Sequence, residues 1–157
     1  MKINLLHDEF YDKKYTLFAI KSNLKDYRLA YFFNKKTDLL FNRMTKDLKY
    51  ILKNNTVYFS VFIDNHFDDK KKCCLISNKT IYSDDLKYGS LFKNIPISNN
   101  MFLIPELKEF DYILKLDGIW TKKEIRGLEK SMTKISEIVA NICVDSIKIK
   151  SINNLIF

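Results

Sequence analysis

The sequence predicts a single α+β domain over residues 1–157, with a mainly antiparallel sheet and two principal helices packed on one of its faces. Two long segments carry helix start signals and apolar residues at helical spacing, and the segments around them alternate like strands or form short apolar runs. A chain of 157 residues, 46% of them hydrophobic, is long enough to bury its own core without a stabilising metal or disulfide.

The N-terminal part begins with an apolar run at residues 15–21, which is typical of a buried central strand. A helix is expected from Asn23, its N-cap, to about Lys35, with Asp26 in the first turn, where a carboxylate favours the helix dipole. Apolar and aromatic residues surround most of this helix, which predicts burial on more than one side. Residues 38–52 are less clear and fit a strand and a turn.

Two hairpins are expected in the middle of the chain. Residues 57–63 alternate between apolar and other side chains, and residues 73–79 return as their partner strand after a polar loop. A weak helical turn near residues 83–88 leads to a second hairpin, in which 101–104 and 110–116 flank the loop 105–109.

The last long element has the clearest helix signal. Thr121 and Glu124 form a T-x-x-E capping box, in which each side chain bonds the free backbone N–H of the other residue. Apolar residues then recur at helical spacing from Ile125 to Ile142, which predicts one long helix. The tail at residues 147–150 alternates like an edge strand whose lysines point outward.

The net charge is +8, from 27 Lys and Arg against 19 Asp and Glu. A basic protein can bind nucleic acid or another acidic partner. The composition offers a second explanation, because Lys, Ile and Asn dominate and Gly, Ala, Pro and Arg are scarce, as in proteins from AT-rich genomes. The sequence leaves open whether the charge is selected for binding or results from codon drift.

No metal site, cofactor or membrane span is expected. The three cysteines are too few and too poorly spaced for a disulfide framework, and adjacent Cys73 and Cys74 on a strand would point to opposite faces. There is no Gly-rich phosphate loop and no G-x-S-x-G elbow. The longest uncharged stretch, residues 94–105, is too short to cross a bilayer, and the N-terminus turns acidic before a signal peptide could form.

One motif suggests a family. Ile104-Pro105-Glu106, followed after three residues by Phe110-Asp111-Tyr112, resembles the signature of the IPExxxVDY family, small proteins of the bacterial phylum Bacteroidota. Phe110 stands where the signature has Val. Residues 26–31, 75–79 and 154–157 resemble the same family, so the likeness spans nearly the whole chain. It implies a bacterial lineage and a cytosolic setting, and it implies no particular chemistry.

The motif residues have two interpretations. Glu106 and Asp111 could converge for acid–base work or to hold a cation. Alternatively they serve the turn: Pro105 fixes its backbone, Glu106 accepts backbone N–H bonds, and Asp111 opens the next strand as a turn residue, followed by Tyr112. The structural interpretation is favoured because no histidine lies nearby in the sequence. No residue is therefore assigned as catalytic.

Arg28 is one of only three arginines and lies in an otherwise apolar helix, beside Asp26 and Tyr27. A buried guanidinium needs a partner, so we expect Arg28 to pair with Glu106 or Asp111. The functional alternative is that Arg28 holds the phosphate or carboxylate of a ligand.

The same helix mixes aromatic and basic residues. Such a mixture can stack unpaired RNA bases while cations hold the backbone, although aromatic residues at helical spacing are more often part of a core. The possible RNA contacts are Lys25, Tyr31, Lys35 and Lys36.

Three functions follow from these patterns. The leading hypothesis is a non-enzymatic cytoplasmic adaptor in a housekeeping role, which binds another protein or forms a homo-oligomer. The alternative is an RNA-associated protein that uses its Lys-rich surface. The third is an enzyme or small-anion binder centred on Arg28, Glu106 and Asp111.

Overall fold

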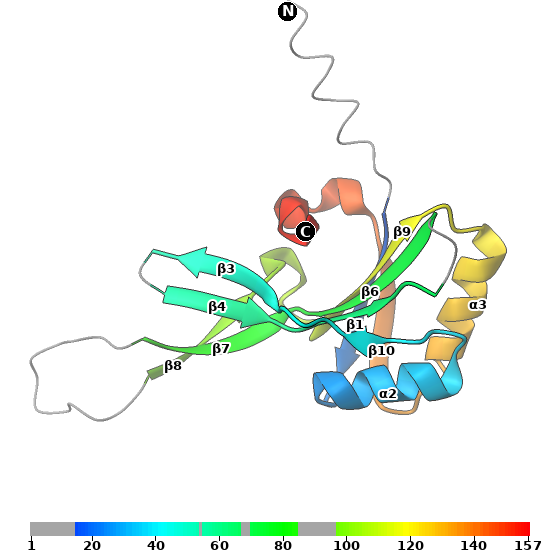
Figure 1. Cartoon of the computed structure of the whole chain (residues 1–157), viewed down its shortest axis with the longest axis horizontal. Coiled ribbons are helices and arrows are strands. Elements are labelled where there is room, and N and C mark those ends of the chain that lie inside the picture. The colour runs from blue at the N-terminus through cyan, green and yellow to red at the C-terminus, as the bar shows by residue number, and fades with distance from the viewer. Residues whose placement is uncertain (1–14, 54, 67–69, 85–96) are drawn as a thin grey trace, which may run out of the picture.

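A six-stranded antiparallel sheet in the order β10-β1-β9-β6-β5-β2 forms the centre of the computed structural model, which describes residues 15–53, 55–66, 70–84 and 97–157 (Figure 1). Its strands are β1 (Thr16–Ser22), β2 (Asn42–Arg43), β5 (Val61–Asp64), β6 (Lys71–Ser77), β9 (Tyr112–Gly118) and β10 (Ile138–Val144). The remaining elements are α2 (Asp26–Lys36), β3 (Leu48–Leu52), β4 (Asn55–Phe59), β7 (Lys79–Asp84), β8 (Ile97–Phe102), η1 (Pro105–Leu107), α3 (Lys122–Met132), η2 (Ser146–Lys148) and η3 (Lys150–Leu155).

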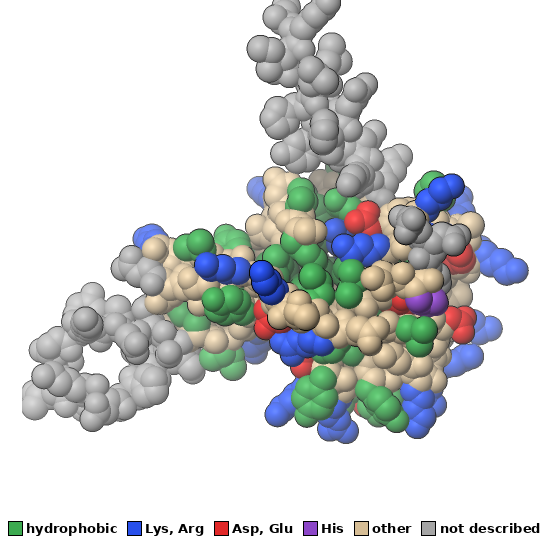
Figure 2. Space-filling view, in the orientation of Figure 1, with side chains coloured by type: hydrophobic (Ala, Val, Ile, Leu, Met, Phe, Trp, Pro, Cys, Tyr) green, Lys and Arg blue, Asp and Glu red, His purple; other side chains and the backbone are tan. Residues whose placement is uncertain are grey.

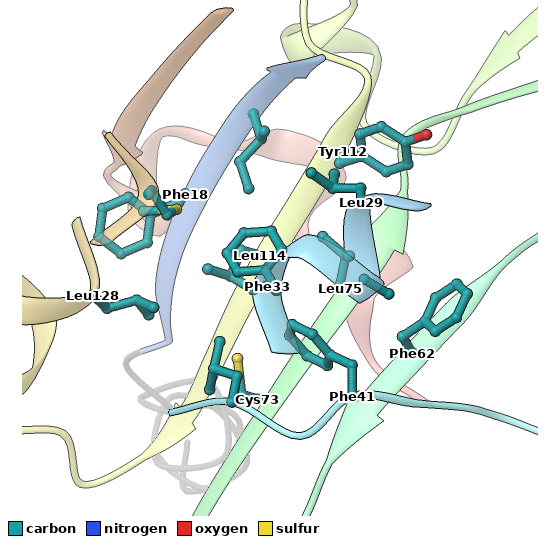
Figure 3. Packing of buried hydrophobic residues seen from close by; sticks show 14 of the residues in the cluster. Phe18, Leu29, Phe33, Phe41, Phe62, Cys73, Leu75, Tyr112, Leu114 and Leu128 are labelled. Atoms are coloured by element: carbon teal, nitrogen blue, oxygen red, sulfur yellow. The ribbon is translucent and has the colours of Figure 1, made fainter. Parts of the chain in front are cut away.

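Both long helices cover the same face of this sheet, as the sequence predicts. Leu29 and Phe33 of α2 and Met132 of α3 are buried in one cluster with sheet residues such as Phe18 and Leu114 (Figure 3). The predicted α+β class is therefore confirmed.

The opposite face carries a second buried cluster under the C-terminal turns. Leu17, Ala19 and Ile113 of the sheet pack there with Ile149 and Leu155 from the end of the chain. The alternation of residues 57–63 follows the same division, because Val57, Phe59 and Val61 belong to this cluster whereas Phe62 faces the helices. Cys73 and Cys74 also lie on opposite faces, as expected.

Two hairpins extend from the sheet as an arm. The long strand predicted at residues 57–63 is divided at Ser60 into β4 and β5, and β6 and β7 are divided at Asn78. Beyond these points β4 pairs with β3 and β7 pairs with β8. Figure 1 shows the arm projecting to the left of the sheet. The arm supplies surface that is not part of the six-stranded core.

The helix predicted from Thr121 to Ile142 is too long. The capping box is present, but α3 ends at Met132, and the apolar residues beyond it form β10, which pairs with β1. The β-branched side chains at 138, 139 and 142 fit a pleated strand as well as a helix, and pairing with β1 decides between the two.

Three other local predictions are wrong. The segments around the motif do not form a hairpin, because β8 pairs with β7 while β9 pairs with β1 and β6. The tail at 147–150 forms 3₁₀ turns instead of a strand. The turn expected at 83–88 is strand β7 up to Asp84, and the rest lies outside the described residues.

The first helix also begins later than expected. Its N-cap position is Lys25, which makes no capping side-chain bond, and Asp26 is the first helical residue. Within the described ranges, no helix is long and apolar enough to cross a membrane.

Candidate functional site

Asn78, at the end of β6, fixes the backbone of the motif. Its side-chain amide donates hydrogen bonds to the carbonyl oxygens of Leu107 and Phe110 at 2.9 and 3.0 Å. Its Oδ1 accepts a hydrogen bond from the backbone N–H of Ile104 at 2.8 Å. Because Asn78 is completely buried, these bonds replace all contact with water. The only sequence signal for this residue is its place in the family-like stretch 75–79.

Glu106 connects the motif to the end of the chain. Pro105 begins the turn η1, and Glu106 Oε1 accepts a hydrogen bond from the backbone N–H of Ser151 at 2.9 Å. Burial alone would raise the pKa of Glu106, but hydrogen bonds from its own backbone and from Ser151 outweigh burial and hold the pKa below its ordinary value. Asn154 adds a second link by donating to the carbonyl oxygen of Leu103 at 2.8 Å.

Asp111 and Tyr112 perform the same kind of task at the start of α2. Asp111 Oδ2 accepts a hydrogen bond from the backbone N–H of Ser22 at 3.0 Å and lies 3.5 Å from Lys21 Nζ. The Tyr112 hydroxyl donates to the carbonyl oxygen of Leu24 at 2.5 Å, and burial raises its pKa, helped by nearby Asp26 and Asp111 carboxylates. Both residues line an open groove of about 520 Å³, but their polar atoms already hold the backbone. The motif is therefore a structural junction.

Arg28 does not form the predicted ion pair with Glu106 or Asp111. Its side chain is exposed, and no ion pair of Arg28 occurs in the part of the chain that the structure describes. The reason is that α2 is buried along one side only, through Leu29 and Phe33, so that Arg28 points to solvent. The three residues proposed for an enzymatic or anion-binding centre thus do not come together.

A second cluster surrounds Asp64, which is completely buried. Its carboxylate accepts hydrogen bonds from the backbone N–H groups of Leu40 at 2.7 Å and His66 at 3.0 Å, and it is hydrogen-bonded to the His66 ring. Cys73 lies opposite Asp64 in the strand register, but burial raises its pKa, so the thiol is a poor nucleophile. Within the described residues, no group of three His, Cys, Asp or Glu side chains could hold a metal ion.

The outer side of α2 is an exposed aromatic and basic surface. Tyr27 and Tyr31 lie one helical turn apart, with 56% and 57% of each side chain exposed. Lys35 Nζ lies 5.9 Å from the centre of the Tyr31 ring. Figure 2 shows hydrophobic side chains with Lys and Arg around them along the lower edge, where α2 runs. The exposed cations of this helix and its N-cap are Lys25, Arg28, Lys35 and Lys36.

A groove of about 630 Å³ beside β2 continues the basic character. Arg43, Lys46, Lys49 and Tyr58 contribute to its lining, and 54% of Tyr58 is exposed. Sequence reasoning missed this groove because it forms between β2 and the β3–β4 hairpin, in the stretch whose structure was unclear. The available signal was Arg43, one of three arginines in the chain.

Strand β10, at the opposite edge of the sheet, differs in character. Its sequence, IVANICV, carries no charge, and it has no further strand on its outer side among the described residues. Val139 is 68% exposed and Ile142 is 45% exposed. Sequence reasoning missed this edge because it assigned the segment to a helix.

The fold and these surfaces define an antiparallel α+β protein with an apolar sheet edge at β10 and a basic–aromatic surface formed by the outer side of α2 and the groove beside β2. Comparison with family models, curated proteins and solved structures finds no match in any of the three. The resemblance to the IPExxxVDY family therefore stays a prediction, and the surfaces themselves carry the functional argument.

Proposed function

We propose that the protein is a non-enzymatic protein-binding module, an adaptor with a housekeeping role in the bacterial cytosol. The observation that carries this proposal is the uncharged, exposed edge strand β10. The family-like motif supports the proposed bacterial setting, and its polar groups serve the backbone.

An edge strand presents a row of backbone N–H and C=O groups to which an extended segment can add. Most soluble proteins protect such an edge with lysine, proline or a covering element. β10 has neither residue, and Val139 and Ile142 expose apolar surface on it. Its pairing with β1 is irregular at Val139, which lies between the pairs Lys21–Ala140 and Ser22–Ile138 and has no partner residue on β1, so the regular part of the docking edge runs from Ala140 to Val144. Exposed apolar surface of this kind marks interaction sites.

The proposed occupant is an extended apolar segment of a partner protein. Main-chain hydrogen bonds would provide affinity, and the side chains of Val139 and Ile142 would select apolar neighbours. Glu137 and Asp145 border the strand in the sequence, so basic residues at both ends of the partner segment would improve the match.

The test is a tagged pull-down from cells with and without nuclease, comparing the native chain with Val139→Lys. Lysine would leave β10 paired with β1 but place a charge in the docking edge. The matched control is Ile119→Lys, because Ile119 is similarly exposed, at 72%, and lies outside β10. The proposal expects a stoichiometric protein that survives nuclease, is retained by Ile119→Lys and is lost with Val139→Lys.

Equal recovery of that protein by both lysine variants would contradict the proposal. Light scattering coupled to size exclusion tests one further outcome. A native chain that runs as a dimer, and as a monomer after Val139→Lys, would identify a second copy as the occupant and overturn the separate partner.

An RNA-associated role is a second candidate, favoured by the two exposed tyrosines and the cations of α2. These residues lie on α2, which covers one face of the sheet, and not on β10.

A further inference from the structure

The outer face of α2 and the basic groove beside β2 adjoin each other. Arg43, which lines the groove, lies 3.6 Å from Asp26 in the first turn of α2, measured between Nη1 and Oδ2. Arg43 Nη2 also bonds both carboxylate oxygens of Asp47, at 2.7 and 2.9 Å. The guanidinium is therefore held in place where the two surfaces meet. We call the combined surface the basic–aromatic strip: Tyr27, Arg28, Tyr31 and Lys35 of α2 with Arg43, Lys46, Lys49 and Tyr58 of the groove.

Three tyrosines of the strip are exposed. Tyr27, Tyr31 and Tyr58 each leave more than half of the side chain accessible to solvent. They do not belong to either buried cluster, which removes the main structural explanation for aromatic residues on this helix. An exposed ring costs hydration free energy unless something stacks on it, and aromatic rings with neighbouring cations are the usual platform for unpaired bases.

The charge of the strip is complementary to a phosphate backbone. Lys46 and Lys49 are exposed beside the groove and have no ion pair with any other described residue. The carboxylates of Asp26 and Asp47 are both engaged by Arg43. The two lysines are thus available to neutralise phosphates.

Arginine placement argues against codon drift as the whole explanation. Drift toward AT-rich codons accounts for abundant lysine, but it does not account for where the few arginines lie. Two of the three arginines of the chain, Arg28 and Arg43, lie on the strip. Arginine has a planar fork that suits phosphate oxygens and base planes.

We propose that the basic–aromatic strip binds single-stranded RNA. Bases stack on Tyr27, Tyr31 and Tyr58, while lysines of the groove and Arg28 hold the phosphates. A duplex is excluded as the preferred ligand because its bases already stack on each other and leave no face for the tyrosines. RNA is the single-stranded nucleic acid that a cytosol offers in quantity. This binding goes beyond the proposed protein-binding function and uses residues of α2 and of the groove beside β2, none of which belongs to β10.

The experiment measures fluorescence anisotropy of a labelled oligouridine of about 15 nucleotides, a length that suits a site of this kind. Oligothymidine of the same length and an RNA duplex are the comparison probes, and salt is varied between about 50 and 200 mM. The proposal expects binding to oligouridine that exceeds duplex binding and weakens steeply with salt. Tighter binding of oligothymidine than of oligouridine would assign the strip to DNA and overturn the RNA proposal.

Two pairs of variants locate the binding site. Lys46→Gln/Lys49→Gln removes two cations of the groove, and Lys122→Gln/Lys123→Gln removes two exposed cations from the first turn of α3. Loss of two phosphate contacts lowers the slope of log K against log salt by about 1.4 for the groove pair. The α3 pair leaves the slope unchanged. An equal fall in this slope for both pairs of variants would show that net charge alone attracts the RNA and would overturn the proposal.

Tyrosine variants test stacking separately from charge. Tyr27→Ala and Tyr31→Ala each lower the affinity roughly 5-fold or more, since stacking is worth about 1–3 kcal/mol per base. Tyr27→Phe retains the ring and therefore the affinity. Because Tyr27 and Tyr31 are exposed, the alanine variants fold, and unchanged melting temperatures verify this. Affinity that is unaffected by both alanine variants would overturn the proposal.

Discussion

Asn78 shows how one buried amide can organise a segment that reads like a functional motif. Its side chain satisfies two carbonyl oxygens and one N–H of residues 104–110, which have no sheet partner of their own. Asp111 and Tyr112 then tie the end of that segment to β1 and to the entry of α2. At the scale of single residues, the polar side chains of this segment bond its own backbone and that of neighbouring segments.

Replacing Asn78 by alanine is expected to destabilise the fold strongly. The change leaves one buried and two partly buried backbone groups without this partner, and the expected loss of unfolding free energy is about 3 kcal/mol. In a chain of this size the melting temperature would fall by about 6 to 12 °C. Thermal unfolding measures the change, and Asn23→Ala, at an exposed asparagine, is the control. Equal shifts in the two variants would contradict the role given to Asn78.

Helix α3 shows what a local pattern can and cannot predict. Its start was predictable because a capping box is a property of four consecutive residues: Thr121 Oγ1 accepts from the Glu124 N–H at 3.2 Å, and Glu124 Oε2 accepts from the Thr121 N–H at 2.8 Å. Its end was not predictable because Ile138, Val139 and Ile142 fit a helix and a strand alike. The partner that decides, β1, is more than a hundred residues away in the chain.

The same distinction explains the other results at the scale of elements. The strand at 57–63 and the opposite facing of Cys73 and Cys74 follow from alternation within one segment. The pairing of β9 with β1 and β6 depends on contacts between segments distant in sequence. The surfaces at β10 and in the groove beside β2 depend on that pairing, so they could not be predicted before it was known.

The start of α3 also gives a prediction about pH. Lys71 Nζ lies 2.5 Å from Glu124 Oε1, and hydrogen bonds from Lys71 and Thr121 lower the pKa of Glu124 to about 2. Because the folded pKa lies below that of the unfolded chain, the stabilisation is complete above about pH 5 and is lost as the pH falls toward 2. Unfolding free energies of the native chain and Glu124→Gln should therefore differ at pH 7 and converge at low pH.

Urea unfolding at several pH values measures this convergence. Glu129→Gln is the control. It makes the same chemical change in α3, at a residue that belongs neither to the capping box nor to the ion pair with Lys71. A constant difference between the native chain and Glu124→Gln down to pH 2 would show that the carboxylate does not act through its charge.

The two proposed binding surfaces use different parts of the molecule: β10 forms one edge of the sheet, whereas the basic–aromatic strip runs from the outer side of α2, on one face of the sheet, to the groove beside β2. Antiparallel pairing and two buried clusters hold that sheet together. The two surfaces share no residue. Under the two proposals, the protein connects an extended protein segment to a single-stranded RNA.

This arrangement predicts that the two binding activities are independent. Val139→Lys should abolish capture of the protein partner and leave oligouridine affinity within about 2-fold of the native value. The reason is that mutations at sites without shared contacts have independent effects on free energy. Lys46→Gln/Lys49→Gln should weaken oligouridine binding and leave capture of the protein partner unchanged. The measurement is a pull-down and an anisotropy titration on the same preparations, followed by anisotropy with the purified partner present. A partner that displaces oligouridine would contradict the independence of the two sites.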